Sequence, residues 1–251
     1  MILGLVPTRA GSVGIPSKNV KPFMGRPLTS YAIEVGLEVC DRVVLAYDDP
    51  LVCAMLAPWL REDRASVCWL PAEYATAAVQ VPTVVAYVLD VDVPPVEDDD
   101  LVLVLQPTSP WRTPDQLRRA IDVLTTGQGY SSVVSVSQVP PTYHPDLVCA
   151  IDKDAGPVLR LWESAHAVGS PWPTGRNREP VYRRDGAVYA VRAPYAVTGD
   201  LYGPKPYPQV SEKVYAPLDE PQDWVFAVPA QAGLESRLQM VELTDRRGPH
   251  D

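Results

Sequence analysis

The sequence predicts an α/β fold, in which helices cover both faces of a mostly parallel sheet. Short apolar runs alternate with segments of helical periodicity along most of the chain. Several of these runs carry no alternating polar residues, which is typical of strands buried on both faces. The chain has 251 residues, 46% of them hydrophobic, which is enough for one large domain. We therefore expect residues 1–251 to form a single domain.

The elements follow one another in a regular order. The predicted strands are 2–7, 42–46, 66–70, 101–105, 131–137 and 187–191. The predicted helices are 27–39, 51–60, 82–89 and 112–124. In parallel sheets, ligands bind beyond the carboxyl ends of the strands. The loops after Val6, Ala46 and Leu105 are therefore the places where a site is expected.

The pattern weakens over residues 140–180, where proline, glycine and aromatic residues are frequent. We interpret this segment as an excursion from the sheet that carries a dimer contact, so a homodimer is expected. Residues 223–242 show helical stretches, and residues 248–251 are interpreted as a frayed tail.

Composition and charge exclude several classes of protein. The net charge is −9, from 22 basic and 31 acidic residues, which argues against a nucleic-acid-binding surface. No run approaches the roughly 20 apolar residues that span a bilayer, and residues 1–7 lack the basic start of a signal peptide. The four cysteines show no CxxC spacing and indicate buried side chains in a reducing compartment. We expect a cytoplasmic protein without nucleic-acid or membrane partners.

A glycine-rich loop, VPTRAGSVGIPSKN, follows the first predicted strand at residues 6–19. Its glycines permit close approach of the backbone, and Arg9 and Lys18 flank them. Backbone N–H groups and two cations together make a suitable cradle for a triphosphate. The spacing fits neither a P-loop nor a dinucleotide-binding fingerprint. A simple glycine-rich connector is the alternative interpretation.

Three further segments carry polar groups in positions that suit a ligand site. LQPTSPWR (105–112) follows the most apolar strand, and Gln106 could hydrogen-bond a polyhydroxylated acid. The alternative is a capping turn, with Thr113 as the cap of the next helix. VYRRDGAVY (181–189) could line an acceptor pocket, or could be surface charges around a turn glycine. LDEPQDW (218–224) contains Asp219, an oxygen ligand of the kind that Mg²⁺ prefers, and Asp223, which is expected to cap the last helix.

These four segments resemble the signature segments of the acylneuraminate (CMP-sialic acid) cytidylyltransferases. The resemblance runs from about Ile2 to Trp224. It implies a Rossmann-like sheet of the nucleotide-diphospho-sugar transferase type. It also implies an enzyme in which an acceptor oxygen of an acidic sugar attacks the α-phosphorus of CTP and pyrophosphate is released, with Mg²⁺ as cofactor.

The resemblance assigns a role to each candidate residue. The residues expected to carry catalysis are Arg9, Lys18 and Asp219. Those expected to bind the nucleotide are Gly11, Ser12, Gly14, Asn19 and Gln80, and those expected to face the acceptor are Gln106, Tyr182 and Arg184. The metal would be held by Asp219, and Asp48 is a second candidate ligand.

The chain departs from the family pattern at charged positions. Val13, Leu70, Ala77 and Pro217 stand where the family has a lysine, an arginine and two aspartates. Residues 77–81 also lack the small hydroxyl residues that contact cytosine in the family, so relaxed base selectivity is expected. Two alternatives therefore stay open: a nucleotidyltransferase with a changed base or acceptor in a secondary-metabolite pathway, and a non-catalytic nucleotide- or sugar-binding module.

Overall fold

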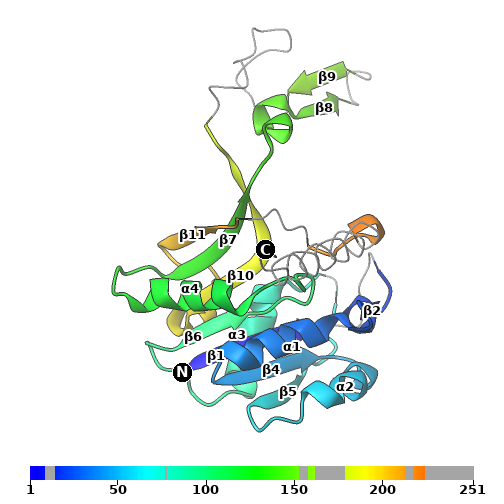
Figure 1. Ribbon diagram of the computed structural model, residues 1–251, viewed down its shortest axis with the longest axis vertical. Helices are drawn as coiled ribbons and strands as arrows, with labels where there is room; N and C mark the ends of the chain where they lie inside the picture. The colour runs from blue at the N-terminus through cyan, green and yellow to red at the C-terminus, as the bar shows by residue number, and fades with distance from the viewer. Residues whose placement is uncertain (9–14, 77, 153–157, 162–178, 213–216, 224–251) are drawn as a thin grey trace, which may run out of the picture.

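A seven-stranded sheet forms the centre of the protein (Figure 1). The computed structural model describes residues 1–8, 15–76, 78–152, 158–161, 179–212 and 217–223. The strands are β1 (Ile2–Thr8), β4 (Arg42–Tyr47), β5 (Ala65–Trp69), β6 (Leu101–Val104), β7 (Ser132–Gln138), β10 (Tyr182–Arg192) and β11 (Pro206–Val210). Their order is β11-β7-β10-β6-β1-β4-β5. Neighbours are parallel except at β10, which is antiparallel to both β6 and β7. The predicted α/β class with a mostly parallel sheet is confirmed.

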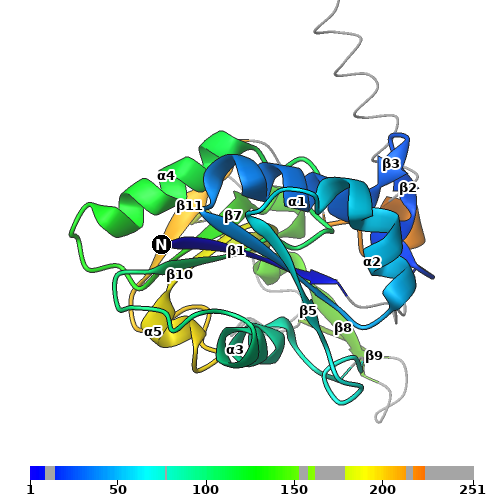
Figure 2. The same cartoon turned by 90° about the horizontal axis from the view of Figure 1, so that it is seen from below.

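Helices cover both faces of this sheet (Figure 2). On one side lie α1 (Leu28–Val39), α2 (Pro50–Leu56) and α4 (Pro114–Thr125), and on the other lie α3 (Val81–Val91) and the short α5 (Ala193–Ala196). Successive strand residues alternate between the two cores: Leu5 packs with the α3 side, and Val6 packs with the α1 side. Because both faces are covered, the central strands are apolar throughout.

The order of the strands determines where a ligand can bind. From β1 the chain first moves to one side, to β4 and β5, and then returns to the other side to add β6. The connections after β1 and β6 therefore lead away from each other at the carboxyl ends of two neighbouring parallel strands. Open α/β sheets bind their ligands at such a switch point. Thr8 and Val104 end these two neighbouring strands at that point.

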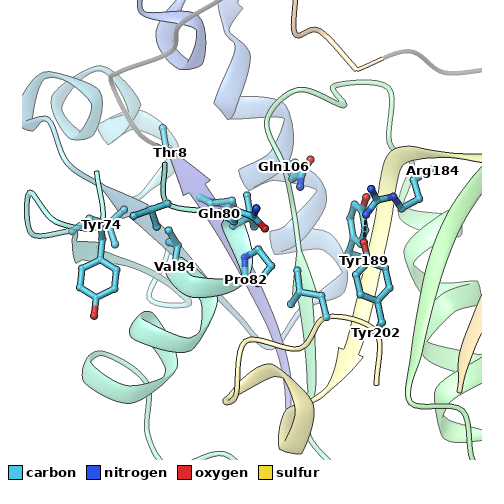
Figure 3. Close-up of a pocket in the computed structure, with 14 residues that line it drawn as sticks. Thr8, Tyr74, Gln80, Pro82, Val84, Gln106, Arg184, Tyr189 and Tyr202 are labelled. Carbon is cyan, nitrogen blue, oxygen red and sulfur yellow. Dashed lines mark hydrogen bonds between the residues drawn. The ribbon is translucent and has the colours of Figure 1, made fainter. Parts of the chain in front are cut away.

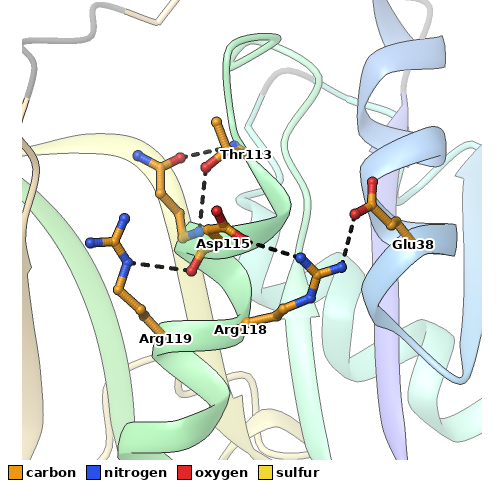
Figure 4. Close-up of polar contacts among 6 residues, drawn as sticks. Glu38, Thr113, Asp115, Arg118 and Arg119 are labelled. Carbon is orange, nitrogen blue, oxygen red and sulfur yellow. Dashed lines mark hydrogen bonds and ion pairs between the residues drawn. The ribbon is translucent and has the colours of Figure 1, made fainter.

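Helix α4 begins in the way that its sequence predicts (Figure 4). The Thr113 hydroxyl accepts a hydrogen bond from the Gln116 backbone N–H at 3.4 Å, and the Gln116 side-chain oxygen accepts one from the Thr113 N–H at 2.9 Å. This reciprocal pair is a capping box, so the predicted cap at Thr113 is confirmed. Farther along, Arg118 pairs with Glu38 of α1 at 2.8 Å. That pair is exposed and contributes little compared with the apolar contact between the two helices.

Between β7 and β10 the chain leaves the sheet and forms a separate element (Figure 1). Two short 3-10 helices, Pro141–Tyr143 and Pro145–Leu147, lead to an antiparallel pair, β8 (Cys149–Asp152) and β9 (Val158–Leu161). Figure 1 shows this element projecting beyond the ends of β7 and β10. It coincides with the predicted excursion at 140–180, whose role in a dimer stays a prediction.

Several elements differ from the sequence prediction for local reasons. Helix α2 ends at Leu56 and continues as a 3-10 helix through Pro58, whose ring removes an N–H donor. Strand β10 begins at Tyr182, five residues before the predicted start. Strand β11 was not predicted, because Pro206 and Pro208 conceal it; an edge strand tolerates such prolines. The helix predicted at 223–242 and the tail at 248–251 fall almost entirely outside the described residues.

None of the helices in the described ranges has the length and apolar character needed to cross a membrane.

Candidate active site

A cavity of about 450 Å³ opens at the predicted edge of the sheet, beside the ends of β1 and β6 (Figure 3). Its size is typical of a small-molecule site. The lining residues are Pro7, Thr8, Leu70, Tyr74, Val79, Gln80, Val81, Pro82, Val84, Gln106, Arg184, Tyr189, Leu201 and Tyr202. Three residues predicted from sequence, Gln80, Gln106 and Arg184, therefore meet around one hollow.

One half of the cavity is mostly apolar. Thr8 ends β1, and the residues from Val79 onward lead into α3. Gln80 is exposed and lies between Thr8 and Pro82 in Figure 3. Leu70, which stands where the family has an arginine, is 2% exposed and packs into the core on the α3 side. That position therefore supplies no cation to the cavity.

The other half of the cavity is polar and carries a positive charge. Figure 3 shows Arg184, Tyr189 and Tyr202 grouped here, with Gln106 beside them. The Arg184 guanidinium donates a hydrogen bond to the Tyr202 hydroxyl and lies 5.8 Å from the centre of its ring. Burial raises the pKa of Tyr189, so its hydroxyl stays protonated at neutral pH. This half can donate hydrogen bonds to an anionic or hydroxylated ligand.

A buried arginine holds the two polar segments of the cavity together. Arg112 is 5% exposed and donates hydrogen bonds to the backbone oxygens of Ala187, of Gln106 at 3.0 Å and of Gly186 at 3.4 Å. Ser109 adds a hydrogen bond to the same Gly186 oxygen at 3.0 Å. Burial lowers the pKa of Arg112 to about 10, which still leaves the guanidinium charged at neutral pH. Sequence reasoning did not assign this role to Arg112.

Asp185 stands where the family has asparagine, and it is completely buried. Its carboxylate accepts hydrogen bonds from the hydroxyls of Ser135, of Ser137 at 2.8 Å and of Ser211 at 2.5 Å, and from the Ala187 N–H at 3.1 Å. Burial alone would raise the pKa of Asp185, but these hydrogen bonds outweigh it and hold the pKa below its usual value. The ionised carboxylate thus joins β7, β10 and the chain after β11.

A second group of predicted residues meets at Lys18. Its ammonium lies 2.8 Å from a carboxylate oxygen of Asp219, a residue 201 positions away. The Lys18 side chain is 12% exposed and that of Asp219 is 56% exposed, so the pair opens to solvent on the side of the aspartate. Two of the three residues predicted to carry catalysis are therefore in direct contact.

The segment that carries Asp219 is fixed by its neighbours. Leu218 is completely buried against Phe23 and Leu28, and its N–H donates to the Thr108 oxygen at 2.9 Å. The Asp223 carboxylate accepts from the backbone N–H groups of residue 219 at 3.1 Å and residue 220 at 2.8 Å. Asp223 therefore holds the backbone at Asp219 in place, whereas the last helix that it was predicted to cap lies almost entirely outside the described residues.

The remaining candidates lie elsewhere. Asn19 is 8% exposed, and its backbone oxygen accepts from the Thr29 hydroxyl at 2.8 Å. Tyr182 is 47% exposed at the start of β10, opposite Gln138. Neither residue lines the cavity. Asp48 is half-buried just after β4. Arg9, Gly11, Ser12, Val13, Gly14 and Ala77 lie outside the described residues.

The donor set around Asp219 suits a metal that arrives with a phosphorylated ligand. Within the described ranges, no three His, Cys, Asp or Glu side chains are grouped to hold a metal ion, so Asp48 and Asp219 are not part of such a group. Mg²⁺ is commonly held by one or two carboxylates together with substrate phosphates, and not by a cage of protein groups alone. One accessible carboxylate beside a lysine fits that arrangement.

Comparison with known proteins finds similarity to cytidylyltransferases and CMP-sugar synthases at the level of both sequence and structure. A family model described as Cytidylyltransferase matches residues 3–202. The CMP-N,N'-diacetyllegionaminic acid synthase of Legionella pneumophila is 29% identical over 90% of this chain and 94% of its own length. The N-acylneuraminate cytidylyltransferase of Escherichia coli O18:K1:H7 is 28% identical over 55% of this chain and 31% of its own length. The solved structure of CMP:2-keto-3-deoxy-manno-octonic acid synthetase complexed with CTP superposes with a TM-score of 0.61 at 14% identity, over 92% of this chain and 98% of that one.

Proposed function

Because the chain belongs to the cytidylyltransferase family, we propose that it transfers the cytidylyl group of CTP to an acidic sugar and releases pyrophosphate. The observation that carries the acceptor part is the polar half of the cavity, where Gln106 and Arg184 meet at the switch point of the sheet. A cation and an amide on one wall suit a ligand that has both a carboxylate and hydroxyls. The relatives named above support this choice, since their names specify acidic sugars.

The reaction is an in-line displacement, in which a bond forms between an acceptor oxygen and the α-phosphorus while the bond to pyrophosphate breaks. Catalysis of such transfers consists mainly of positioning and of stabilising negative charge. Lys18 would bind the phosphate oxygens, and Gln106 and Arg184 would orient the acceptor. Arg9 and the backbone at Gly11, Ser12 and Gly14 would also bind the triphosphate. Asn19 and Gln80 would bind the nucleoside.

We assign Mg²⁺ to Asp219 as part of the same proposal. Bound there with the triphosphate, the ion would neutralise charge on the phosphates. Lys18 pairs with Asp219 in the structure, and a metal held by the carboxylate would leave the lysine ammonium available to the phosphates. Pro217 fills the position of the family's other aspartate, and Pro217→Asp should lower the Mg²⁺ concentration needed for half-maximal activity and for half-saturation in a direct metal titration with CTP present. An unchanged metal requirement in both measurements would contradict the assignment.

Pyrophosphate release tests the proposed function. CTP should be consumed with at least one acceptor from a panel of N-acetylneuraminic acid, N,N'-diacetyllegionaminic acid and 2-keto-3-deoxy-manno-octonic acid. Faster turnover with another nucleoside triphosphate would identify an enzyme with a changed base. Nucleotide binding without pyrophosphate release from any pair would identify a non-catalytic module.

The same assay tests base selectivity. Val79 and Val81 line the cavity beside Gln80, so few side chains there can hydrogen-bond a base. Sites that use hydrogen bonds reject wrong ligands strongly, whereas apolar sites discriminate weakly. We therefore expect a preference for CTP below about 10⁴-fold in relative kcat/KM.

We also propose a cytoplasmic location, because free cysteine thiols are typical of proteins in a reducing compartment. Cys40, Cys53 and Cys68 form no disulfide. Burial raises the pKa of Cys40 to about 12 and that of Cys68 to about 11, so both are inert protonated thiols.

A further inference from the structure

Arg184 is distinctive among the residues around the cavity because of its charge. Of the described residues that line the cavity, it alone carries a charged side chain. An acidic ligand in this hollow therefore has one fixed cation available from its described walls. The guanidinium has five N–H donors in a planar fork that matches a carboxylate.

The partner of Arg184 stands on a rigid turn. The Asp200 carboxylate accepts hydrogen bonds from the backbone N–H groups of Tyr202 at 2.9 Å and Gly203 at 3.0 Å. The Tyr202 backbone oxygen accepts from the hydroxyls of Ser131 at 2.7 Å and Ser132 at 2.6 Å. Four hydrogen bonds thus fix the backbone from which the Tyr202 ring projects toward Arg184 (Figure 3).

We propose that Tyr202 is a positioning residue that holds Arg184 in the orientation in which it binds the carboxylate of the acceptor. Arg184 is exposed, and a free arginine side chain samples many rotamers. The hydrogen bond to the Tyr202 hydroxyl uses one donor of the fork and leaves others for the cavity. A preoriented cation loses less conformational entropy when the ligand binds. This inference rests on the proposed function, since it specifies which group of the acidic sugar is recognised and by what.

Tyr202→Phe tests the role of the hydroxyl, because it keeps the ring. The KM for the best sugar acid of the panel should rise about 3- to 10-fold, which is the effect of one hydrogen bond, while the KM for CTP stays unchanged. Tyr207→Phe is the matched control. Its ring packs on Tyr130 at 5.0 Å between centroids, and it does not line the cavity. An unchanged KM for the sugar acid in Tyr202→Phe would overturn the proposal.

A double-mutant cycle separates positioning from a general effect on the fold. In an Arg184→Ala background, Tyr202→Phe should have no further effect on the KM for the sugar acid. An equal loss in both backgrounds would show that Tyr202 does not act through Arg184. Arg184→Lys, which keeps the charge at an exposed position but lacks the fork, should also raise this KM.

The group that Arg184 recognises is tested with the methyl ester of the same sugar acid. Wild type should bind the free acid more tightly than the ester in calorimetry, and Arg184→Ala should lose that preference. A preference that survives in Arg184→Ala would overturn the assignment. If the proposed function is wrong, the wild type releases no pyrophosphate. The calorimetric comparison measures binding alone, so it tests the role of Arg184 independently of turnover.

Discussion

At the scale of single residues, charge in the site depends on a few side chains with defined partners. The Lys18 side chain is 12% exposed and pairs with Asp219, and under the proposed function its ammonium group binds the triphosphate. Arg112 and Asp185 are buried charges that hold the walls of the cavity and do not line it. Arg112 and Asp185 thus support the walls of the cavity, whereas the role proposed for Lys18 is to bind the ligand.

Lys18→Ala should lower kcat/KM for CTP about 10- to 150-fold, because a charge-assisted hydrogen bond to phosphate contributes about 1.5–3 kcal/mol. Lys205→Ala is the control. The Lys205 ammonium donates a hydrogen bond to the backbone oxygen of Gln128 at 2.9 Å. Gln128 lies in the turn before β7, at the amino-terminal ends of the parallel strands and away from the cavity. Steady-state kinetics with varied CTP gives the answer, and near-wild-type values for Lys18→Ala would remove this residue from the active site.

Asp185→Asn should reduce stability in a manner that depends on pH. The pKa of Asp185 is lowered in the folded state, so its ionised form stabilises the fold above the unfolded pKa of about 4 and this contribution is lost as pH falls below it. We expect a loss of about 1–3 kcal/mol at pH 7, because serine donors lose an ionised acceptor. Urea unfolding at pH 7 and at about pH 2, well below the unfolded pKa, measures the difference between wild type and variant. A difference that does not shrink at the lower pH would mean that the charge of Asp185 is not what stabilises the fold.

At the scale of elements, helix α1 approaches the sheet closely because it carries a glycine at the contact. A Cβ added at Gly36 would lie 2.7 Å from Cδ1 of Leu105 and 3.0 Å from Cγ2 of Val43, and both side chains are completely buried. The close approach packs α1 directly against Leu105, the residue that precedes Gln106.

Gly36→Ala should therefore lower the free energy of unfolding, against the usual helix preference. Alanine gains up to about 1 kcal/mol of helix propensity, whereas overpacking a core costs about 1–3 kcal/mol. We expect a net loss of about 1 kcal/mol in chemical denaturation. Combining the change with Leu105→Val, which shortens the facing side chain, should recover part of that loss. A stabilised single variant would show that the core relaxes around the added methyl group.

Helices and strands with a clear hydrophobic periodicity were predictable from the sequence. Contacts between residues far apart in the sequence were not. The strands around β1 are apolar runs, and α4 shows both its cap at Thr113 and its apolar stripe, so local patterns locate them. Tyr202 carries no local signal, since its role comes from the turn at Asp200 and from a partner on β10. The motif residues Gln106 and Arg184 were predicted to face a ligand, and the structure places both at the cavity. Tyr182 was predicted with them, but the side chain lies outside the cavity, at the base of the projecting element.

At the scale of the whole molecule, we expect the projecting element to be needed for dimer formation and not for folding of the sheet. Residues Gln138 and Tyr182 are paired across β7 and β10, and the Val139 N–H donates to the Val181 oxygen at 2.9 Å. Replacing residues 140–180 with Asn-Gly would close this hairpin with a favourable two-residue turn. The shortened chain should melt cooperatively, but light scattering after gel filtration should show a monomer where the full chain is a dimer. A shortened chain that remains a dimer would place the contact elsewhere, and a monomeric full chain would refute the homodimer.

The position of β10 also affects how the protein folds during its synthesis on the ribosome. Strands β1, β4, β5 and β6 are complete once residue 104 has been made, and they are neighbours in the sheet. Strand β7 pairs in that sheet with β10 and β11, so its partners are synthesised about fifty residues later or more. Long-range pairings form slowly, and unpaired apolar strands are prone to aggregate. A translational pause before residue 192 would leave β7 unpaired, so the nascent chain, and not the finished enzyme, is the species that would need a chaperone.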